Sequence, residues 1–157
     1  MFDANVPRVL DMLSPTDVVL DTGGWASPFN RANFILDTEP YETRGFYRTF
    51  GGAPFQGPTE ESFTEATWIR RDICERTPYP FADKPIDFVI CSQTLEDIRD
   101  PLWVCQEMMR IGKRGYIETP SRVAEWPSAH EDGSIRDSPV CHTIGGLSRW
   151  TTRRFAS

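Results

Sequence analysis

The sequence predicts a single α/β domain, residues 1–157, with a Rossmann-like, doubly wound and mainly parallel sheet. Short, continuous apolar runs recur along the chain, as expected of strands that are buried on both faces of a parallel sheet. A well-marked helix separates the last two runs with the spacing of a parallel crossover unit. The length of 157 residues is typical of one domain, and 39% hydrophobic content indicates a globular chain.

The chain opens with a predicted helix that is followed by the first strand. Apolar residues repeat at i, i+3, i+4 and i+7 and form one helical stripe: Val6, Val9, Leu10 and Leu13. Residues 14–16 (SPT) end this helix. The first strand covers residues 18–20 (VVL), and it leads into a turn at residues 21–24 (DTGG).

Four further strands are predicted. Residues 34–36 (FIL) form the second, which ends at Asp37, and residues 67–73 form the third, which two arginines interrupt. Residues 86–91 (IDFVIC) give the clearest strand pattern, and residues 115–119 (GYIET) form the fifth strand, stopped by Pro120.

The helix before the fifth strand has clear end signals. Asp100 is expected to cap it, Pro101 suits its first turn and Gly112 is expected to end it. Lys113 and Arg114 would then complement the negative end of the helix dipole. The predicted apolar face consists of Leu102, Cys105 and Met109, with Met108 beside them.

Several regions lack a regular pattern. Residues 23–32 (GGWASPFNRA) contain no strong helix-forming run, so the helix between the first two strands is expected to be missing. Residues 40–58, rich in Gly, Pro and aromatics, predict an ordered loop, and residues 120–149 also lack periodicity. Because only residues 150–155 (WTTRRF) look like a further strand, the sheet is expected to lack its last edge strands.

Composition argues against several classes of partner. The net charge is −6 and no basic cluster beyond Arg153–Arg154 is present, so we expect no nucleic-acid binding. No apolar stretch approaches the length of a membrane span, and the N-terminus does not resemble a secretory signal, so we expect a cytoplasmic protein without membrane contact. The four cysteines and two histidines are not clustered at metal-ligand spacing, so we expect free thiols and no metal.

Polar residues follow the predicted strands. Ligands of doubly wound sheets bind at the carboxyl ends of the strands, near the point where strand order reverses. Aspartate is also common in turns, which explains each acidic residue singly. Taken together the residues predict a ribose and base site: Asp21, Gly23, Gly24, Asp37, Asp72, Ser92 and Gln93.

Residues 17–120 resemble class I S-adenosylmethionine-dependent methyltransferases of the small-molecule, type 11-like branch. Residues 18–24 (VVLDTGG) are similar to the first motif of that family. Residues 80–110 resemble its fourth-strand signature, in which a Pro-Phe-x-Asp-x-x-hydrophobic-Asp run precedes the strand and Ser-x-x-Leu-Glu follows it. The similarity continues through residues 115–120 (GYIETP).

The resemblance implies S-adenosylmethionine as cofactor and a role for each residue of the site. Asp21 precedes the glycine turn, where Gly23 and Gly24 would let the backbone approach the methionyl end. Asp37 would accept from both ribose hydroxyls and Asp72 from the adenine amino group. The remaining residues would pack on adenine or line the wall near the sulfonium: Ile73, Ser92 and Gln93.

The chain departs from the family pattern at the glycine turn and after the fourth strand. Trp25 and Ser27 stand where the family has its second and third glycines. Either the loop takes another path, with Trp25 stacking on another residue, or the cofactor pocket is partly filled. In both cases Trp25 is counted among the residues expected to contact the cofactor. Gln93 and Asp97 stand where some relatives have histidines, so no catalytic residue is assigned.

The resemblance implies methyl transfer to a small-molecule or saccharide-type acceptor. A catalytically inactive binding or regulatory module is the alternative, and a different nucleotide-using enzyme of the same topology is a third. An exposed sheet edge would suit a homo-oligomer or a partner that completes the sheet. Loop residues either wall an acceptor pocket or pack the loops onto the sheet: Tyr41, Phe46, Tyr47, Phe50, Phe55 and Trp126, with Glu118 and Arg122 as pocket-edge candidates.

Overall fold

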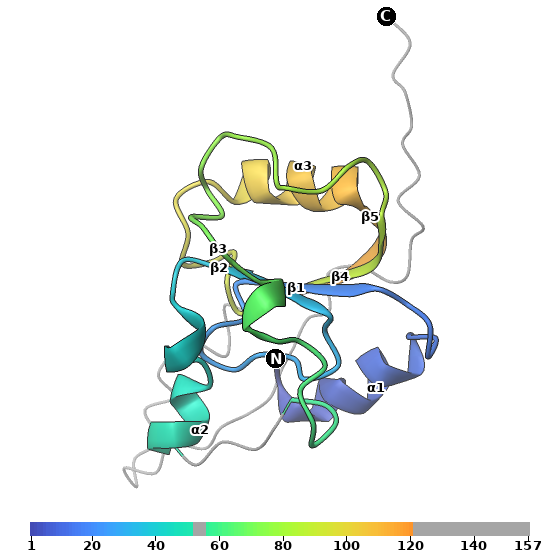
Figure 1. The fold of residues 1–157 in the computed structure, drawn as a ribbon, viewed down its shortest axis with the longest axis vertical. Coiled ribbons are helices and arrows are strands. Elements are labelled where there is room, and N and C mark those ends of the chain that lie inside the picture. Colours follow the sequence, from blue (N-terminus) through green and yellow to red (C-terminus); the bar gives the residue numbers. More distant parts are fainter. Residues whose placement is uncertain (52–55, 121–157) are drawn as a thin grey trace, which may run out of the picture.

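The computed structural model describes residues 1–51 and 56–120, and in this part the chain forms a five-stranded parallel sheet (Figure 1). Its strands, in sequence order, are β1 (Val19–Thr22), β2 (Phe34–Asp37), β3 (Trp68–Arg70), β4 (Ile86–Ser92) and β5 (Gly112–Glu118). The spatial order is β3-β2-β1-β4-β5, and every neighbouring pair is parallel. The predicted Rossmann-like, doubly wound sheet is therefore confirmed, and strand order reverses between β1 and β4.

Helices lie on both sides of this sheet. The helical segments are η1 (Asp3–Asn5), α1 (Val6–Asp11), η2 (Tyr41–Thr43), α2 (Phe46–Gly51), η3 (Glu65–Thr67) and α3 (Pro101–Ile111). Helix α3 covers one face, whereas α1 and α2 lie on the opposite side (Figure 1). Residues 23–33 between β1 and β2 contain no helix, as expected from their sequence.

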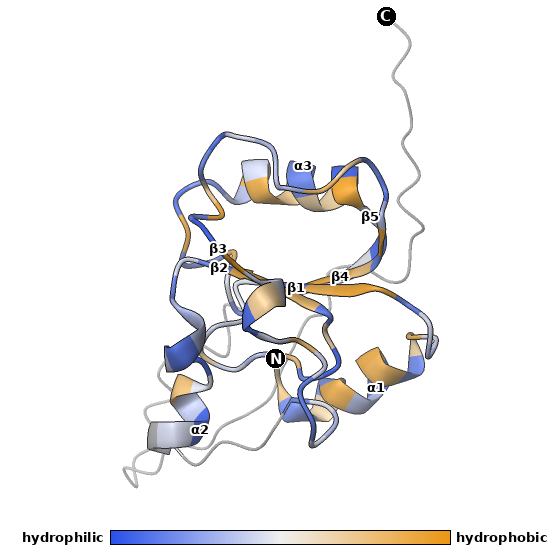
Figure 2. Ribbon diagram, viewed as in Figure 1, coloured by the Kyte–Doolittle hydropathy of each residue, from blue (hydrophilic) through white to orange (hydrophobic). Residues whose placement is uncertain are grey.

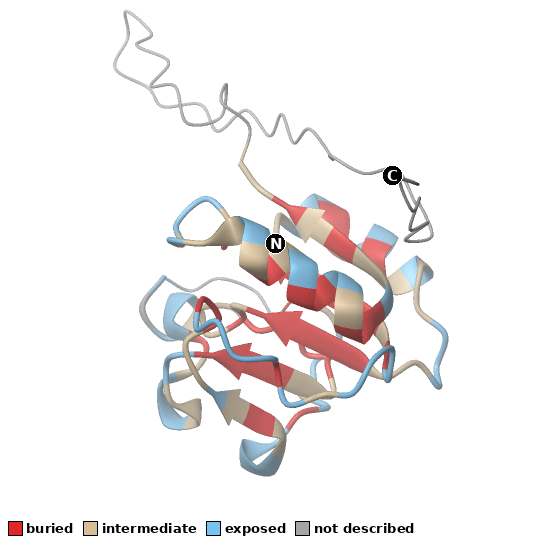
Figure 3. Ribbon diagram, turned by 90° about the horizontal axis from the view of Figure 1, so that it is seen from above, coloured by how far each residue is buried: buried red, intermediate tan, exposed pale blue. Residues whose placement is uncertain are grey.

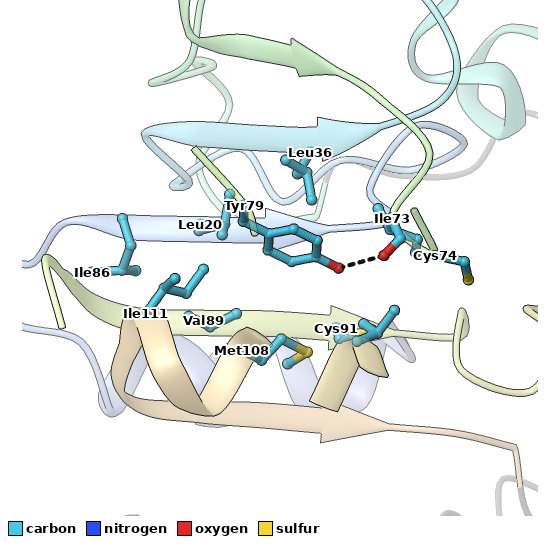
Figure 4. Packing of buried hydrophobic residues seen from close by; sticks show 11 residues of the cluster. Leu20, Leu36, Ile73, Cys74, Tyr79, Ile86, Val89, Cys91, Met108 and Ile111 are labelled. Atoms are coloured by element: carbon cyan, nitrogen blue, oxygen red, sulfur yellow. Dashed lines mark hydrogen bonds between the residues drawn. The ribbon is translucent and has the colours of Figure 1, made fainter. Parts of the chain in front are cut away.

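The alternation of side chains along the strands divides the core into two layers. Leu20 and Val89 point toward α3 and pack with Met108 and Ile111 of that helix (Figure 4). Their neighbours in sequence, Val19 and Phe88, point the other way and pack against the α1 side. Figure 3 shows that the central strands are buried, and Figure 2 shows the hydrophobic residues concentrated along them. Burial on both faces explains why these strands are apolar throughout.

The capping of α3 is as predicted, but its buried face is not. Asp100 Oδ1 accepts a hydrogen bond from the Trp103 N–H at 3.2 Å, and Pro101 occupies the first turn. The predicted face is wrong, because Leu102 is 75% exposed and Met109 is 40% exposed. The buried residues are instead Val104, Glu107, Met108 and Ile111.

The buried face of α3 includes the carboxylate of Glu107. An ion pair with Arg110 at 2.6 Å and a hydrogen bond from the Tyr79 N–H at 2.7 Å satisfy it within the protein. A buried charge that has such partners is tolerated, so the helix presents Glu107 and not Leu102 to the sheet.

The predicted role of Lys113 and Arg114 at the end of α3 is also wrong. Strand β5 begins at Gly112, directly after the helix, so both cations lie within the strand. Lys113 forms an ion pair with Asp87 at 2.6 Å, and Arg114 pairs with Asp17. The helix end is held by Lys84, whose ammonium donates to the Met109 carbonyl and, at 2.6 Å, to the Gly112 carbonyl.

Other predicted regions differ in detail. The region expected to be a loop at residues 40–58 contains η2 and α2, and the third strand is shorter than residues 67–73. The predictions for residues 120–149 and 150–155 fall almost wholly outside the described residues. None of the helices in residues 1–51 and 56–120 is long and apolar enough to cross a membrane. The described cysteines, Cys74, Cys91 and Cys105, are free thiols.

Candidate functional site

Two adjoining cavities open at the carboxyl ends of the strands, beside the point where strand order reverses. Their volumes are about 330 and 530 Å³, which lie in the usual range for small-molecule sites. They share part of their lining, namely Gly23, Ala26, Tyr47 and Gln93. All nine residues predicted from the sequence line one or both cavities. Asp21, Gly24 and Ser92 line the smaller one, Trp25, Asp37, Asp72 and Ile73 line the larger one, and Gly23 and Gln93 line both.

The two glycines of the turn are required by the groups packed against them. Gly23 has a φ of +78°, and a Cβ at this position would lie 2.4 Å from Thr94 Cγ2. A Cβ on Gly24 would lie 2.3 Å from Asp21 Oδ2. The predicted turn is therefore present, and the close approach that excludes side chains is made by the protein itself.

Asp21 is a buried carboxyl group that holds the following loop. It is 4% exposed, and its Oδ2 accepts a hydrogen bond from the Phe29 N–H at 2.9 Å. Burial raises the pKa of Asp21 to about 6, although the Phe29 N–H acts in the opposite direction. This carboxyl group is ionised at pH 7, and it lines the smaller cavity.

Asp37 receives hydrogen bonds from both sides of the strand end. Its Oδ2 accepts from the Trp25 N–H and its Oδ1 from the Glu39 N–H, both at 3.0 Å, and the Thr38 hydroxyl lies 3.3 Å from Oδ1. A carboxylate can accept about four hydrogen bonds, so capacity for a further donor remains. Asp37 and Thr38 both line the larger cavity.

The loop takes the first of the two courses considered from the sequence, in which Trp25 packs against another residue of the protein. Its ring lies 5.4 Å from the ring of Phe46, and its indole N–H donates to the Thr43 carbonyl at 2.9 Å. The backbone N–H of Trp25, and not its ring, reaches Asp37. The larger cavity stays open beside this tryptophan.

Asp72 and Ile73 also line the larger cavity. Asp72 Oδ1 accepts from the Cys74 N–H at 2.8 Å, and Oδ2 pairs with Arg99 at 2.6 Å. Burial alone would raise the pKa of Asp72, but the Cys74 N–H and the Arg99 guanidinium together lower it. Ile73 is buried, and its carbonyl accepts a hydrogen bond from the Tyr79 hydroxyl at 2.9 Å (Figure 4).

Glu118 of β5 orients the residues at the end of β4. Its Oε1 accepts from the Ser92 hydroxyl at 2.9 Å and from the Gln93 amide at 3.1 Å. Its carbonyl accepts from the Gln93 N–H at 2.8 Å, and Gln93 has a φ of +54°. The Phe2 N–H, the Asn5 amide and the Tyr116 hydroxyl also donate to this carboxylate. Glu118 is 2% exposed, so it supports the site from beneath instead of lining its edge.

Burial and hydrogen bonding act in opposite directions on this carboxylate. Burial alone would raise the pKa of Glu118, but the hydrogen bonds from Tyr116, Asn5, Phe2 and Ser92 lower it overall. Glu118 is therefore an ionised carboxylate inside the protein at neutral pH.

Of the loop aromatics, some line the cavities and others pack the loops against the rest of the protein. Tyr47 is 56% exposed and lines both cavities, whereas Tyr41 packs edge-on against Trp68 at 5.7 Å. The side chains of Phe50, Phe55 and Trp126, and residue Arg122, lie outside the described part.

Sequence reasoning missed several lining residues, among them Asp3, Ala26, Thr38, Gln56, Thr94 and Arg99. Thr94 lies two residues after the end of β4, a position that signals the site in this fold.

In the described part of the chain no cluster of His, Cys, Asp and Glu could hold a metal ion. Asp97, considered as a histidine substitute, lines the larger cavity, and its N–H donates to the Thr94 carbonyl at 3.1 Å.

Comparison with protein families identifies one model, described as methionine biosynthesis protein MetW, which matches residues 68–129. This match covers less than half of the chain and begins at β3. A search of curated proteins finds no match.

Several solved structures are similar to the chain at low sequence identity. A methyltransferase from Mesorhizobium loti is 16% identical with a TM-score of 0.49, and covers 79% of this chain and 57% of its own. A methyltransferase from Thermotoga maritima is 17% identical with a TM-score of 0.45, and covers 74% of this chain and 49% of its own. Phosphoethanolamine N-methyltransferase 1 from Haemonchus contortus, solved with phosphoethanolamine and S-adenosylhomocysteine, is 14% identical with a TM-score of 0.47. It covers 88% of this chain and 30% of its own.

The chain therefore spans about half the length of the first two structures, or less than a third in the last case. The first two are described as methyltransferases that depend on S-adenosylmethionine, and the third was solved with S-adenosylhomocysteine.

Proposed function

We propose that the chain binds S-adenosylmethionine across the two adjoining cavities and supplies the cofactor half of a methyl-transfer site. The observation that supports this proposal most strongly is the convergence of nine residues, from four separate strand ends, on one continuous pair of cavities. In a doubly wound sheet this place is where nucleotide ligands bind.

The larger cavity suits the adenosine half of the cofactor. Asp37 retains acceptor capacity for a ribose hydroxyl, and Ile73 supplies an apolar wall for adenine. Asp72 would accept from the adenine amino group in exchange for Arg99. Because the Arg99 side chain is 66% exposed, this ion pair contributes little and its exchange costs little.

The smaller cavity would then receive the methionyl chain and the sulfonium, near Ser92 and Gln93. Methyl transfer is an in-line displacement on an already activated carbon, so alignment of the acceptor can supply much of the catalysis. Glu118 contributes to that alignment, because it holds the side chains of both Ser92 and Gln93. The acceptor, a small molecule or a saccharide-type compound, remains a prediction from the sequence resemblance.

The second candidate is a catalytically inactive binding or regulatory module that retains the fold and has lost the cofactor. It is favoured by the loop after β1, which lacks a helix and in which the Trp25 N–H already occupies part of Asp37. A cytoplasmic location and a partner that completes the sheet also remain predictions. In the described part, β3 and β5 form the two edges where such pairing would occur.

Calorimetric titration with S-adenosylhomocysteine distinguishes the two candidate functions. We expect saturable binding to the full chain, weakened about tenfold or more in Asp37→Ala, because a charge-assisted hydrogen bond to the ribose is lost. Asp11→Asn, a change of an exposed aspartate on α1, is the matched control and should bind as the parent does. A folded protein that shows no binding would refute the cofactor site.

A further inference from the structure

We propose that Arg99 is a specificity-determining residue of the larger cavity, and that it lets this cavity take both adenosyl and inosyl ligands. This inference rests on the proposed function, because it concerns the base that occupies the larger cavity. It assigns the class of nucleoside that the site accepts, which is a purine nucleoside with either an amino or an oxo group at position 6.

Asp72 and Arg99 place a hydrogen-bond acceptor and a donor side by side in the wall of the larger cavity. Both residues line it, and Asp72 Oδ2 lies 2.6 Å from Arg99 Nη2. The Cys74 N–H donates to Asp72 Oδ1 at 2.8 Å, which fixes the orientation of the carboxylate. Each carboxylate oxygen can accept a second hydrogen bond, so the ion pair leaves acceptor capacity for a ligand.

The guanidinium of Arg99 keeps donors that the described part of the protein does not use. Within residues 1–51 and 56–120 it makes one ion pair, with Asp72, whereas a guanidinium carries five N–H groups. Asp97 lines the same cavity, but the ion pair is made with Asp72. The described lining of this cavity includes one basic side chain, that of Arg99. Arg99 is therefore the charged donor that a ligand in the cavity would meet.

Two other arginines near this site bind the protein itself. Arg71 Nη1 donates to the Pro78 carbonyl at 3.0 Å. Arg76 donates to Asp100 Oδ2 through both Nε and Nη2, at 2.9 and 2.8 Å. Neither belongs to the described lining of the larger cavity. Arg99 differs from both in its position at the cavity and in its unused donors.

The edge of a purine near position 6 can use this pair in two ways. Adenine presents an amino group, which Asp72 can accept when Arg99 gives way. A 6-oxopurine presents an oxo acceptor and an N1–H donor, which match the guanidinium of Arg99 and the carboxylate of Asp72 while the two stay paired. A carboxylate alone would leave the oxo group without a donor, and such a site would reject the 6-oxopurine.

The exposure of the pair keeps these two uses close in free energy. The Arg99 side chain is 66% exposed, so the pair is a surface ion pair and opening it for adenine costs little. A 6-oxopurine leaves the pair closed. The cavity should therefore discriminate only weakly between the two bases, and the weak discrimination should depend on Arg99.

Calorimetry on the full chain with S-adenosylhomocysteine and S-inosylhomocysteine tests this inference, because the two ligands differ only at the base. We expect the parent to bind them with affinities within about tenfold of each other. In Arg99→Ala the preference for the adenosyl ligand should increase about tenfold or more, because the oxo group loses a charge-assisted hydrogen bond. Arg99→Lys restores a cationic donor and should bring the preference back toward that of the parent.

Arg76→Ala is the matched control, because it removes another arginine whose side chain is 76% exposed and should leave the preference unchanged. A preference of the parent above about tenfold, or one that Arg99→Ala leaves unchanged, would overturn the inference. Equal loss of both ligands in Arg99→Ala would also overturn it, because Arg99 would then not act on the edge of the base. Failure of the folded parent to bind either ligand would instead overturn the proposed function.

Discussion

Replacement of Asp21 by asparagine should remove a specific pH dependence of stability. Burial raises the pKa of Asp21 from its ordinary value of 3.8 to about 6, so the folded protein binds the proton more tightly than the unfolded chain does. Between these two values the unfolded state carries fewer protons, and the free energy of unfolding must fall as the pH rises. The loss is complete about one pH unit above the folded-state pKa. A difference of about 2.2 pH units at 1.36 kcal/mol per unit amounts to ~3 kcal/mol.

The substitution keeps the shape of the side chain and an acceptor for the Phe29 N–H, which lies 2.9 Å from Oδ2. Urea unfolding, followed by tryptophan fluorescence, measures the free energy of unfolding of both proteins from about pH 5 to pH 7.5. We expect the parent to lose roughly 1.4 kcal/mol relative to Asp21→Asn over this interval, which is the part of the whole effect that lies there. Other carboxyl groups contribute equally to both proteins and cancel in the difference.

Parallel pH profiles for the parent and Asp21→Asn would refute this reasoning. They would mean that the carboxyl group is solvated, and that the loop does not bury it as the structure shows. Asp11→Asn serves as the control, because it removes an exposed aspartate and should leave the profile of the parent unchanged.

Three further substitutions test the support of the site. Gly23→Ala should destabilise the fold by about 1–3 kcal/mol, because the φ of +78° and the contact with Thr94 both exclude a side chain; thermal unfolding measures this. Tyr79→Phe should cost about 1–3 kcal/mol in urea unfolding, because the buried Ile73 carbonyl loses its donor. Glu118→Gln should cost about 2 kcal/mol at pH 7. Since the pKa of Glu118 is lowered in the folded state, this cost should vanish as the pH falls below its ordinary range, which urea unfolding at several pH values checks.

Each of these substitutions has a control, in which the same change is made at a position without the contacts described. A Cβ on Gly51 would meet nothing within 4 Å, so Gly51→Ala should not destabilise the protein. Tyr47→Phe, at a residue that is 56% exposed, is the control for Tyr79→Phe. Glu42→Gln, at an exposed residue, is the control for Glu118→Gln. Equal losses in a substitution and its control would show that the specific contacts described do not carry the stability.

The strands and the site residues could be predicted from the sequence because their signals are local. A strand buried on both faces must be apolar along its length, as residues 86–91 are, and the residue after it reaches the ligand edge of the sheet. Asp37 and Asp72 were placed by this rule alone, and the structure brings both to the wall of the same cavity.

The orientation of α3 could not be predicted because it depends on partners far away in sequence. The pattern of Leu102, Cys105 and Met109 is that of an amphipathic helix, and it favours the wrong face. The buried residue Glu107 is stabilised by Arg110 and by the Tyr79 N–H, 28 residues earlier in the chain. Lys84 could not be predicted for the same reason, because the Gly112 carbonyl to which it donates lies 28 residues later in the chain.

The path of the loop after β1 links the departure from the family pattern to the chemistry of the site. In place of a helix, the loop is held by two carboxylates, with Asp21 bonded to the Phe29 N–H and Asp37 bonded to the Trp25 N–H. Trp25 suits this arrangement, because its ring lies against Phe46 and its backbone is free to reach Asp37. Both carboxylates also line the cavities, so the groups that hold the loop are the groups that a ligand would contact. A ligand that donates to them would add hydrogen bonds to the carboxylates that hold the loop. Stability of the loop and affinity of the site for its ligand are therefore predicted to change together in Asp21→Asn.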